Sequence, residues 1–430
     1  MAASPDHPTV DVTLDADSLA AIAPGTGNQP ERLEWFRDQA LGMFIHWGLD
    51  VMLGTVPSHW MIGADPALVD RFIQETPTWF DPSAFAPEQY ARLARQVGMR
   101  YAVFTAKHHS GFCMFETATT PFNVMATPYA RDVTGLFLAA FRNHGIAPGL
   151  YFSPLDFLWC HQQGKALHFR TPEVMPANNP ALMDYNLAQV TELLTYYGAL
   201  DTLFFDGPPE QLRELAWSLQ PQVVITRGAM ETPEQCLPDE PLAEAWEACW
   251  TIGDGWSYKP TLDTVKSGSQ LIDMLIRTRA MGGNLLLNVT PGPDGGIPPE
   301  QERVLRELGT WLFFNGEAIY GVRPWRMPRE QQIWYTRAKD SDTVYAFVTG
   351  TPWHLGTRRQ LTLRGVAATD ATTISIVGQC DILEHSPEAD TAVRWQQDES
   401  GLNIDAMLCY RPWDNRRWPN AIVLRITGAR

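Results

Sequence analysis

Polar side chains that could perform chemistry lie at or directly after the ends of several short apolar segments of this sequence. They are His46, His108, His109, Tyr151, Asp206 and Arg227. A carboxylate grouped with imidazoles, a phenol and a guanidinium can hold a polar substrate, act as a nucleophile or bind a metal ion. If each apolar segment is a strand of one parallel sheet, these side chains meet at the carboxyl ends of the strands and form one site.

Each residue also has a structural explanation when it is taken alone. Asp206 could cap the next helix, because Asp is a favoured N-cap residue. Arg227 could pair with a surface carboxylate, and a single histidine at a strand end is often held by core hydrogen bonds. However, the Gly-Pro-Pro at 207–209 delays any helix after Asp206. The convergence of three histidines with an aspartate and an arginine therefore favours a functional site.

The elements that must position these residues alternate between helical and strand patterns. The predicted pairs are 87–99 with 101–106, 130–145 with 147–153, 181–198 with 201–207, 209–221 with 222–226, and 267–283 with 284–289, followed by a last helix at 298–316. This alternation predicts an α/β fold, a TIM-like (β/α) barrel catalytic domain over residues 31–328.

The two ends of the chain differ from this central part. Residues 1–30 are rich in Pro, Gly, Ala and Asp and are predicted to be an irregular N-terminal lead-in. Residues 329–430 contain short β-branched segments such as TVYAFVT and AIVLRIT, with no helical pattern between them. They predict a C-terminal antiparallel β-sandwich domain.

Composition excludes several classes of partner. Lys and Arg number 33 against 49 Asp and Glu, so the net charge of -16 argues against a nucleic acid or an anionic membrane surface. No segment approaches a membrane span. The N-terminus lacks the basic and apolar regions of a signal peptide, so we expect a cytoplasmic protein, or a periplasmic or secreted one if a signal peptide was removed. The six cysteines show no zinc-binding spacing.

Longer motifs around these positions resemble the alpha-L-fucosidases of glycoside hydrolase family 29. Between about residues 33 and 325 they are FIHWG, SHW at 58–60, TAKHHSGF, FFDG, WEACWTIGDGWSY, GGNLLLNVTPGPDGGIPPEQ and NGEAIYGVRPW. The resemblance implies a retaining, exo-acting enzyme that removes terminal alpha-L-fucose from fucosylated oligosaccharides or glycoconjugates, without a cofactor or a metal. The expected partner is a fucosylated glycan, and a homo-oligomer remains open.

A retaining glycosidase needs two carboxyl groups about 5–5.5 Å apart, one as nucleophile and one as acid and then base. By the resemblance, Asp206 occupies the nucleophile position and forms a covalent fucosyl intermediate. We expect Glu247, in WEACW, to be the acid/base, because neighbouring tryptophans would raise its pKa by desolvation. Asp254 is the main alternative, with Glu244 and Glu240 as further candidates.

The fucose pocket is expected to combine hydrogen-bonding groups with an aromatic wall. The resemblance assigns substrate binding to His46, His59, Trp60, His108, His109, Tyr151, Arg227 and Trp256. Many relatives have Glu where this chain has His59, which puts the usual contact there in question. The sequence has 16 tryptophans, and those at 47, 60, 246, 250 and 256 fall in the motifs expected to build the pocket.

Two other functions are compatible with the same residues. A metal-dependent hydrolase could use His46, His108, His109 and Asp206 as ligands, although adjacent histidines in a regular strand point to opposite faces. A catalytically inactive fucose-binding protein would use the tryptophans for recognition alone.

Overall fold

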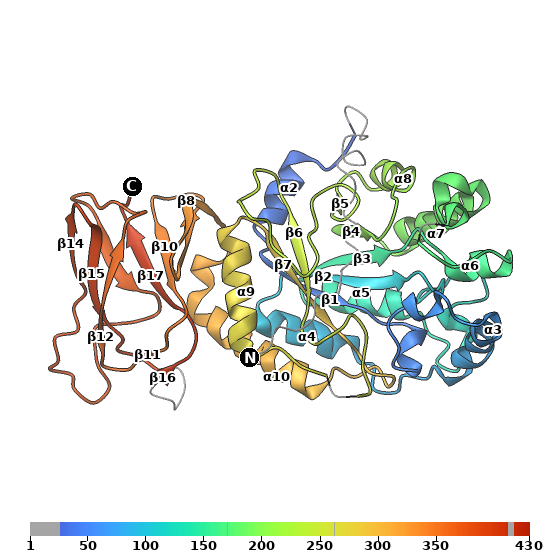
Figure 1. Cartoon of the computed structure of the whole chain (residues 1–430), viewed down its shortest axis with the longest axis horizontal. Helices are drawn as coiled ribbons and strands as arrows, with labels where there is room; N and C mark the ends of the chain where they lie inside the picture. Colours follow the sequence, from blue (N-terminus) through green and yellow to red (C-terminus); the bar gives the residue numbers. More distant parts are fainter. Residues whose placement is uncertain (1–25, 170, 262, 412–416) are drawn as a thin grey trace.

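The computed structural model describes residues 26–430 except residues 170, 262 and 412–416. Figure 1 shows two parts, an α/β part that carries the N-terminal three quarters of the chain and an antiparallel part that carries the rest. Most of the predicted lead-in lies outside the described residues. No helix within the described ranges is long and apolar enough to cross a membrane.

The α/β part is built on a curled sheet of seven strands in the order β5-β4-β3-β2-β1-β7-β6. All of its neighbouring strands are parallel. The strands are β1 (Leu41–Ile45), β2 (Tyr101–Lys107), β3 (Ala147–Phe152), β4 (Thr202–Phe205), β5 (Val224–Ile225), β6 (Glu247–Thr251) and β7 (Asn284–Val289). The described residues of β5 and β6 share no ladder, so the sheet curls without closing into a complete hydrogen-bonded barrel.

Helices cover the outside of this sheet, and the predicted alternation is confirmed. They are α2 (Pro30–Arg37), α3 (Pro66–Glu75), α4 (Pro87–Val97), α5 (Val133–Asn143), α6 (Phe157–Gln162), α7 (Pro180–Tyr196), α8 (Leu212–Leu219), α9 (Gly268–Ala280) and α10 (Pro299–Asn315). Asp132, Asn179 and Ser267 accept backbone N–H bonds at the starts of α5, α7 and α9. Such caps satisfy donors that have no partner within the helix.

The strands are buried on both faces, which explains why their sequences read as continuous apolar segments. The outer face packs on the helices. The inner face forms its own cluster, which includes Phe44, Tyr101, Tyr151 and Phe204. Loops and two short 3₁₀ helices, η1 (Leu49–Met52) and η2 (His59–Met61), follow β1 at the carboxyl ends of the strands.

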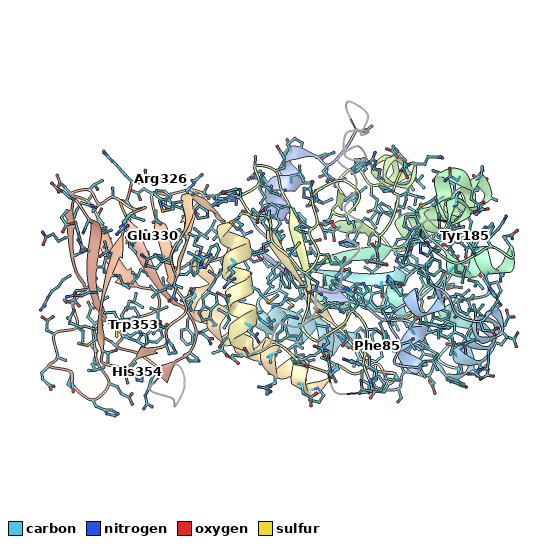
Figure 2. All side chains as sticks on the ribbon, in the orientation of Figure 1. Phe85, Tyr185, Arg326, Glu330, Trp353 and His354 are labelled. Atoms are coloured by element: carbon cyan, nitrogen blue, oxygen red, sulfur yellow. The ribbon has the colours of Figure 1, made fainter. Side chains whose placement is uncertain are left out.

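In the antiparallel part, the described residues form three sheets. Five strands pair in the order β13-β17-β10-β9-β8, three in the order β12-β15-β14, and β11 pairs with β16. Their bounds are β8 (Val322–Glu330), β9 (Ile333–Ala338), β10 (Val344–Val348), β11 (Trp353–His354), β12 (Arg358–Leu363), β13 (Thr373–Ile376), β14 (Arg394–Asp398), β15 (Gly401–Met407), β16 (Arg417–Trp418) and β17 (Ile422–Thr427). Figure 2 labels Glu330 and Trp353 in this part. Glu330, the last residue of β8, accepts the backbone N–H of Arg364 at 2.9 Å. Trp353 of β11 is buried.

Candidate active site

The polar residues expected to converge do meet at the carboxyl ends of the strands. Asp206 directly follows β4, and its backbone N–H donates to the carbonyl of Phe152 at the end of β3. Tyr151 belongs to β3, and Arg227 comes two residues after β5. Because parallel strands bring their carboxyl ends to one edge, side chains from separate segments become neighbours there.

Asp206 is held by three side chains. Arg227 donates to its Oδ1 at 3.0 Å, the Tyr151 hydroxyl donates to its Oδ2 at 2.5 Å, and His109 Nε2 lies 3.5 Å from Oδ2. Burial alone would raise the pKa of Asp206, but Arg227, His109 and Tyr151 outweigh it and lower the pKa to about 2. The carboxylate is therefore ionised at neutral pH while 21% of its side chain remains exposed.

Arg227 joins Asp206 to a second carboxylate that the sequence analysis missed, Glu234. One Arg227 Nη atom binds Asp206, and the other lies 3.2 Å from Glu234 Oε2. The Glu234 side chain is 38% exposed. Its segment is anchored to β6, because Gln235 donates to the carbonyl of Cys249 and Cys249 donates to that of Pro233. The signal that could have pointed to Glu234 is its position shortly after Arg227, at the same end of the sheet.

Glu247 lies at a different level of the sheet interior. It is the first residue of β6, and Tyr101, the first residue of β2, donates to its Oε2 at 2.5 Å. Cys249, on the same face of the strand two residues later, contacts Arg227 at 3.6 Å. Glu247 is thus one layer of side chains below the Asp206–Arg227 pair and is 0% exposed. The structure does not bring it to Asp206.

Burial raises the pKa of Glu247 to about 7, and Trp246 is not the residue that desolvates it. Trp246 faces away from Glu247 because successive strand residues point to opposite sides, and its Nε1 donates to the carbonyl of Met281. The apolar interior of the sheet, and not the flanking tryptophan, desolvates this carboxyl group.

The other carboxyl candidates are exposed. Asp254 follows β6 and accepts the Lys259 ammonium at 3.2 Å and the backbone N–H of Thr264 at 3.1 Å. Although slight desolvation opposes them, these partners lower the pKa of Asp254, which is the wrong direction for a general acid. Glu240 and Glu244 are exposed in the segment before β6.

Three histidines line the site, each held through its Nδ1 atom. His46 bonds Asn288 Oδ1 at 2.9 Å, His108 bonds Ser58 Oγ at 2.7 Å, and His109 bonds Ser153 Oγ at 2.5 Å. Burial lowers the pKa of His46 and His109 to about 4 and that of His108 well below its usual value, so all three are neutral at pH 7. The Nε2 atoms of His46 and His108 are therefore neutral hydrogen-bonding atoms for a ligand, while that of His109 lies beside Asp206.

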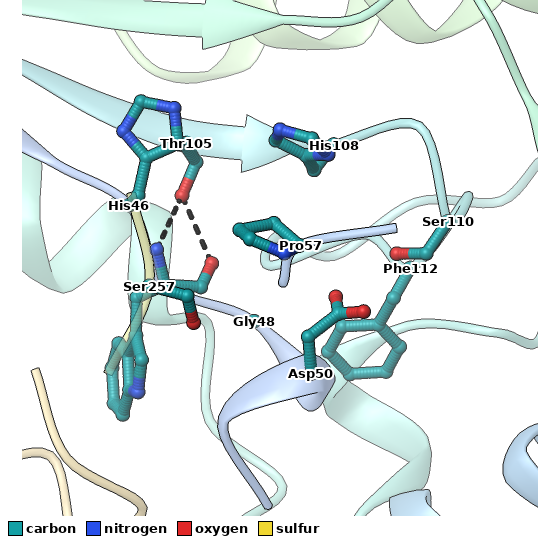
Figure 3. A pocket seen from close by; sticks show the side chains of 10 residues that line it. His46, Gly48, Asp50, Pro57, Thr105, His108, Ser110, Phe112 and Ser257 are labelled. Atoms are coloured by element: carbon teal, nitrogen blue, oxygen red, sulfur yellow. Dashed lines mark hydrogen bonds between the residues drawn. The ribbon is translucent and has the colours of Figure 1, made fainter. Parts of the chain in front are cut away.

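Aromatic rings complete the walls of the site. His108 stacks on Tyr151 with ring centroids 5.3 Å apart, and the Trp256 ring lies 5.1 Å from His46. Trp60 donates to Asp50, and the exposed His59 ring is 5.8 Å from His109. Figure 3 shows a small cavity lined by His46, Trp47, Gly48, Asp50, Pro57, Thr105, His108, Ser110, Phe112 and Ser257.

Not every expected tryptophan belongs to the site. Trp47 and Trp246 are almost completely buried, and Trp47 packs against Phe80 and Phe85. Trp250 packs against the same core. Trp47 lines the small cavity beside His46, while Trp60 and Trp256 reach the site through the bond to Asp50 and the ring contact with His46. Trp246 and Trp250 belong to the core between the sheet and the helices.

The site is poorly suited to a divalent metal ion. Ligand atoms of His108, His109 and Asp206 do lie within 4.8 Å of one another. However, both Asp206 oxygens already accept hydrogen bonds, one of them from the cationic Arg227. A metal ion would have to displace these partners and would be repelled by the guanidinium, so the metal-dependent alternative is not favoured.

Arg227 joins an ionised carboxylate to a second, accessible carboxylate at one edge of a curled parallel sheet. Neutral histidines and aromatic rings lie beside them. This combination of groups defines a glycoside hydrolase. The sequence profile of the family described as Alpha-L-fucosidase matches residues 24–317. Tissue alpha-L-fucosidase of Rattus norvegicus is 30% identical over 398 residues, covering 80% of this chain and 81% of the relative. The chain belongs to the alpha-L-fucosidase family, and its activity is that of an alpha-L-fucosidase.

Solved structures support the same fold. Alpha-L-fucosidase isoenzyme 1 from Paenibacillus thiaminolyticus is 25% identical with a TM-score of 0.72, and the match covers 92% of this chain and 98% of that one. A GH29 alpha-L-fucosidase of Bacteroides thetaiotaomicron, trapped as a covalent intermediate with 2-fluoro-fucosyl fluoride, is 23% identical with a TM-score of 0.74. That match covers 95% of this chain and 98% of the other.

Proposed function

We propose that the enzyme hydrolyses terminal alpha-L-fucosides of oligosaccharides or glycoconjugates with retention of configuration, with Asp206 as nucleophile and Glu234 as acid/base. The observation that supports this pair is the bridge through Arg227, whose two Nη atoms bind the two carboxylates at 3.0 and 3.2 Å. Glu234 replaces Glu247 in this role because Glu247 is sealed inside the sheet. Residues from 31 to about 321 would form a TIM-type catalytic domain, and the rest a β-sandwich domain, because β8 (Val322–Glu330) already pairs in the antiparallel sheet and moves the boundary ahead of the expected 328/329.

The first step forms a fucosyl-enzyme. An oxygen of Asp206 attacks the anomeric carbon while Glu234, protonated, gives its proton to the leaving oxygen as the glycosidic bond breaks. To deliver that proton, Glu234 must turn away from Arg227, which its partly exposed side chain allows. In the second step Glu234 removes a proton from water, the water oxygen attacks the anomeric carbon, and Asp206 leaves as a carboxylate.

Arg227 suits both steps because its charge always has a partner. Before the first step it stabilises the ionised Asp206. Once Asp206 has become an ester, Glu234 is a carboxylate and can take the guanidinium as its partner. The total negative charge beside Arg227 thus changes little during the cycle, which avoids leaving a buried cation unpaired.

The sugar itself would be bound by the neutral histidines and the aromatic walls. The imidazoles of His46, His108 and His109 hydrogen-bond the hydroxyls, and Trp60 and Trp256 supply rings for the apolar face and the methyl group. The Tyr151 ring is covered by His108 and Phe204, so Tyr151 contributes through its hydroxyl on Asp206. A site of this kind rejects analogues that lack a hydroxyl, because its own buried groups would then be unpaired. His59, exposed and 5.1 Å from the Phe169 ring, lies where it could contact the leaving group.

The acid/base assignment is tested by azide rescue of Glu234→Ala on an aryl fucoside with a good leaving group. We expect turnover of substrates with poor leaving groups to fall by about 10²–10⁴-fold. Azide should restore activity on the activated substrate and yield alpha-fucosyl azide, identified by NMR. Glu247→Gln is the matched control and should give no azide adduct. An adduct from Glu247→Ala or Asp254→Ala, and none from Glu234→Ala, would assign the acid/base elsewhere.

A further inference from the structure

The loop after β1 carries a buried carboxylate that the proposed chemistry does not use. Asp50, in η1, is 3% exposed. Its Oδ1 accepts the backbone N–H of Ser58 and the indole N–H of Trp60, each at 2.9 Å. Figure 3 shows Asp50 among the residues that line the small cavity, with His46 and His108 across it and Pro57 between them. Asp50 therefore binds two residues further along its own loop.

Ser58, the first of these partners, has an unusual backbone. Its φ angle is +58°, in the left-handed region that residues other than glycine seldom adopt. Such a conformation persists only where several surrounding interactions impose it. The bond from its N–H to Asp50 is one of these interactions, and the Ser58 Oγ supplies two more by binding His108 Nδ1 and accepting the Ser110 N–H, both at 2.7 Å.

The second partner, Trp60, is fixed in the same way. Its indole N–H donates a hydrogen bond to Asp50, and its ring packs on Phe72 of α3 with ring centroids 4.9 Å apart. The orientation of this ring is therefore set from two sides. One oxygen atom of Asp50 thus fixes the orientation of Trp60, in its own loop, directly. Through Ser58, whose hydroxyl binds His108, it also fixes the orientation of this histidine after β2.

We propose that Asp50 is a positioning residue of the sugar pocket: its Oδ1 orients Trp60 directly and His108 through Ser58, so that ligand affinity depends on this buried hydrogen-bond acceptor. This inference rests on the proposed function, since it takes His108 and Trp60 as sugar-binding groups. It concerns binding and not the reacting carboxylates, because no hydrogen bond in the described residues joins Asp50 to Asp206 or Glu234.

Calorimetric titration with a fucose-shaped iminosugar tests the proposal without requiring turnover. Asp50→Ala should weaken binding by at least about tenfold, because both donors lose their acceptor. Asp50→Asn should bind within about threefold of the wild type, because its amide oxygen can accept the same two bonds. On an aryl fucoside, Asp50→Ala should raise KM more than it lowers kcat.

Two further variants keep the test decisive. Ser58→Ala retains both bonds to Asp50 but loses the hydroxyl that holds His108, and should weaken binding by about fivefold or more. Asp132→Ala is the matched control: Asp132 accepts the backbone N–H groups of Gly135 and Glu116 and the Tyr197 hydroxyl, none of which lines the pocket. It should lower Tm and leave iminosugar affinity unchanged.

The outcomes separate this proposal from the proposed function. If Asp50→Ala binds as the wild type does, or if Asp50→Asn loses as much affinity as Asp50→Ala, the positioning role of the acceptor oxygen is overturned. Wild-type affinity in Ser58→Ala would overturn the path to His108. If the wild-type enzyme itself binds no iminosugar and cleaves no fucoside, the proposed function fails instead.

Discussion

Two layers of the sheet interior each hold a carboxyl group bound by a tyrosine hydroxyl at 2.5 Å, yet the pKa values of the two groups are shifted in opposite directions. Asp206, at the carboxyl ends of the strands, has its pKa lowered to about 2. Glu247, one layer below, has its pKa raised to about 7. In both cases burial raises the pKa, so the difference comes from the neighbouring groups.

Arg227 supplies most of that difference. It binds Asp206 directly at 3.0 Å, whereas the groups that hydrogen-bond Glu247 are the neutral hydroxyls of Tyr101 and Thr226. Asp206 is also partly exposed, and Glu247 is not. A raised pKa in a motif that resembles those of a known family is therefore insufficient evidence for a catalytic acid. Access to the substrate has to be shown as well.

The largest expected effect is that of removing the nucleophile. Asp206→Ala should lower kcat/KM on an aryl fucoside by about 10⁴-fold or more, because the covalent route is lost. The far-ultraviolet circular dichroism should remain that of the wild type, and added azide should give the beta-fucosyl azide by direct displacement. Near-normal turnover in this variant would remove Asp206 from the mechanism.

A smaller effect is expected when the bridging guanidinium is replaced. Arg227→Lys keeps the positive charge but cannot bind two carboxylates through a planar fork, so kcat should fall by about 10²-fold. Arg279 is the matched control, since this buried arginine donates to the carbonyls of Gly283 and Ile319 away from the site. Arg279→Lys should lower Tm with kcat retained. Equal kcat losses in the two variants would contradict a special role for Arg227.

The tyrosines provide the next comparison. The Tyr151 hydroxyl helps to lower the pKa of Asp206, so Tyr151→Phe should raise that pKa and move the acid limb of the kcat/KM profile toward higher pH, with activity reduced about tenfold. Tyr101→Phe removes the corresponding bond to Glu247 and should leave the acid limb in place. An identical shift in both variants would show that the two layers are not electrostatically distinct.

The smallest catalytic effect is expected for Glu247→Gln, whose consequence should appear in stability. The pKa of Glu247 is raised from 4.5 to about 7 in the folded state, so the unfolded chain releases this proton first as pH rises. Wild-type stability therefore loses this contribution between pH 4.5 and 7, by on the order of 3 kcal/mol at most. Urea unfolding should show Glu247→Gln gaining stability relative to the wild type across that interval. If the difference in unfolding free energy between Glu247→Gln and the wild type stayed the same at every pH, that would contradict the raised pKa of Glu247.

The sequence could place a residue at this edge of the sheet where that residue directly follows a recognisable apolar strand. Asp206 after TLFF and His46 after GMFI could be placed at the carboxyl ends because the direction of the strand fixes where its last residue lies. The alternation of helices and strands was predictable for the same reason, since hydrophobic periodicity is a local signal.

Glu234 and Glu247 could not be placed in this way. Glu234 belongs to an irregular segment whose position depends on its pairing with Cys249 of β6, a tertiary contact without a local pattern. Glu247 lies in a strand, but only the parallel register with Asn284 shows that it begins that strand and lies below the site. The role of Asp50 could not be predicted either, because its partners Ser58 and Trp60 lie in a loop, and hydrophobic periodicity does not predict the conformation of a loop.

The most direct test of the account is to identify the residue that carries the covalent intermediate. The enzyme is incubated with 2-fluoro-fucosyl fluoride, whose fluorine slows the second step, and is then digested with a protease. Mass spectrometry should find one fluorofucosyl group, on the peptide that contains Asp206, and Asp206→Asn should remain unlabelled. Labelling of Glu234 or Glu247 would contradict the assignment, as would an unlabelled enzyme that releases the beta anomer as its first product.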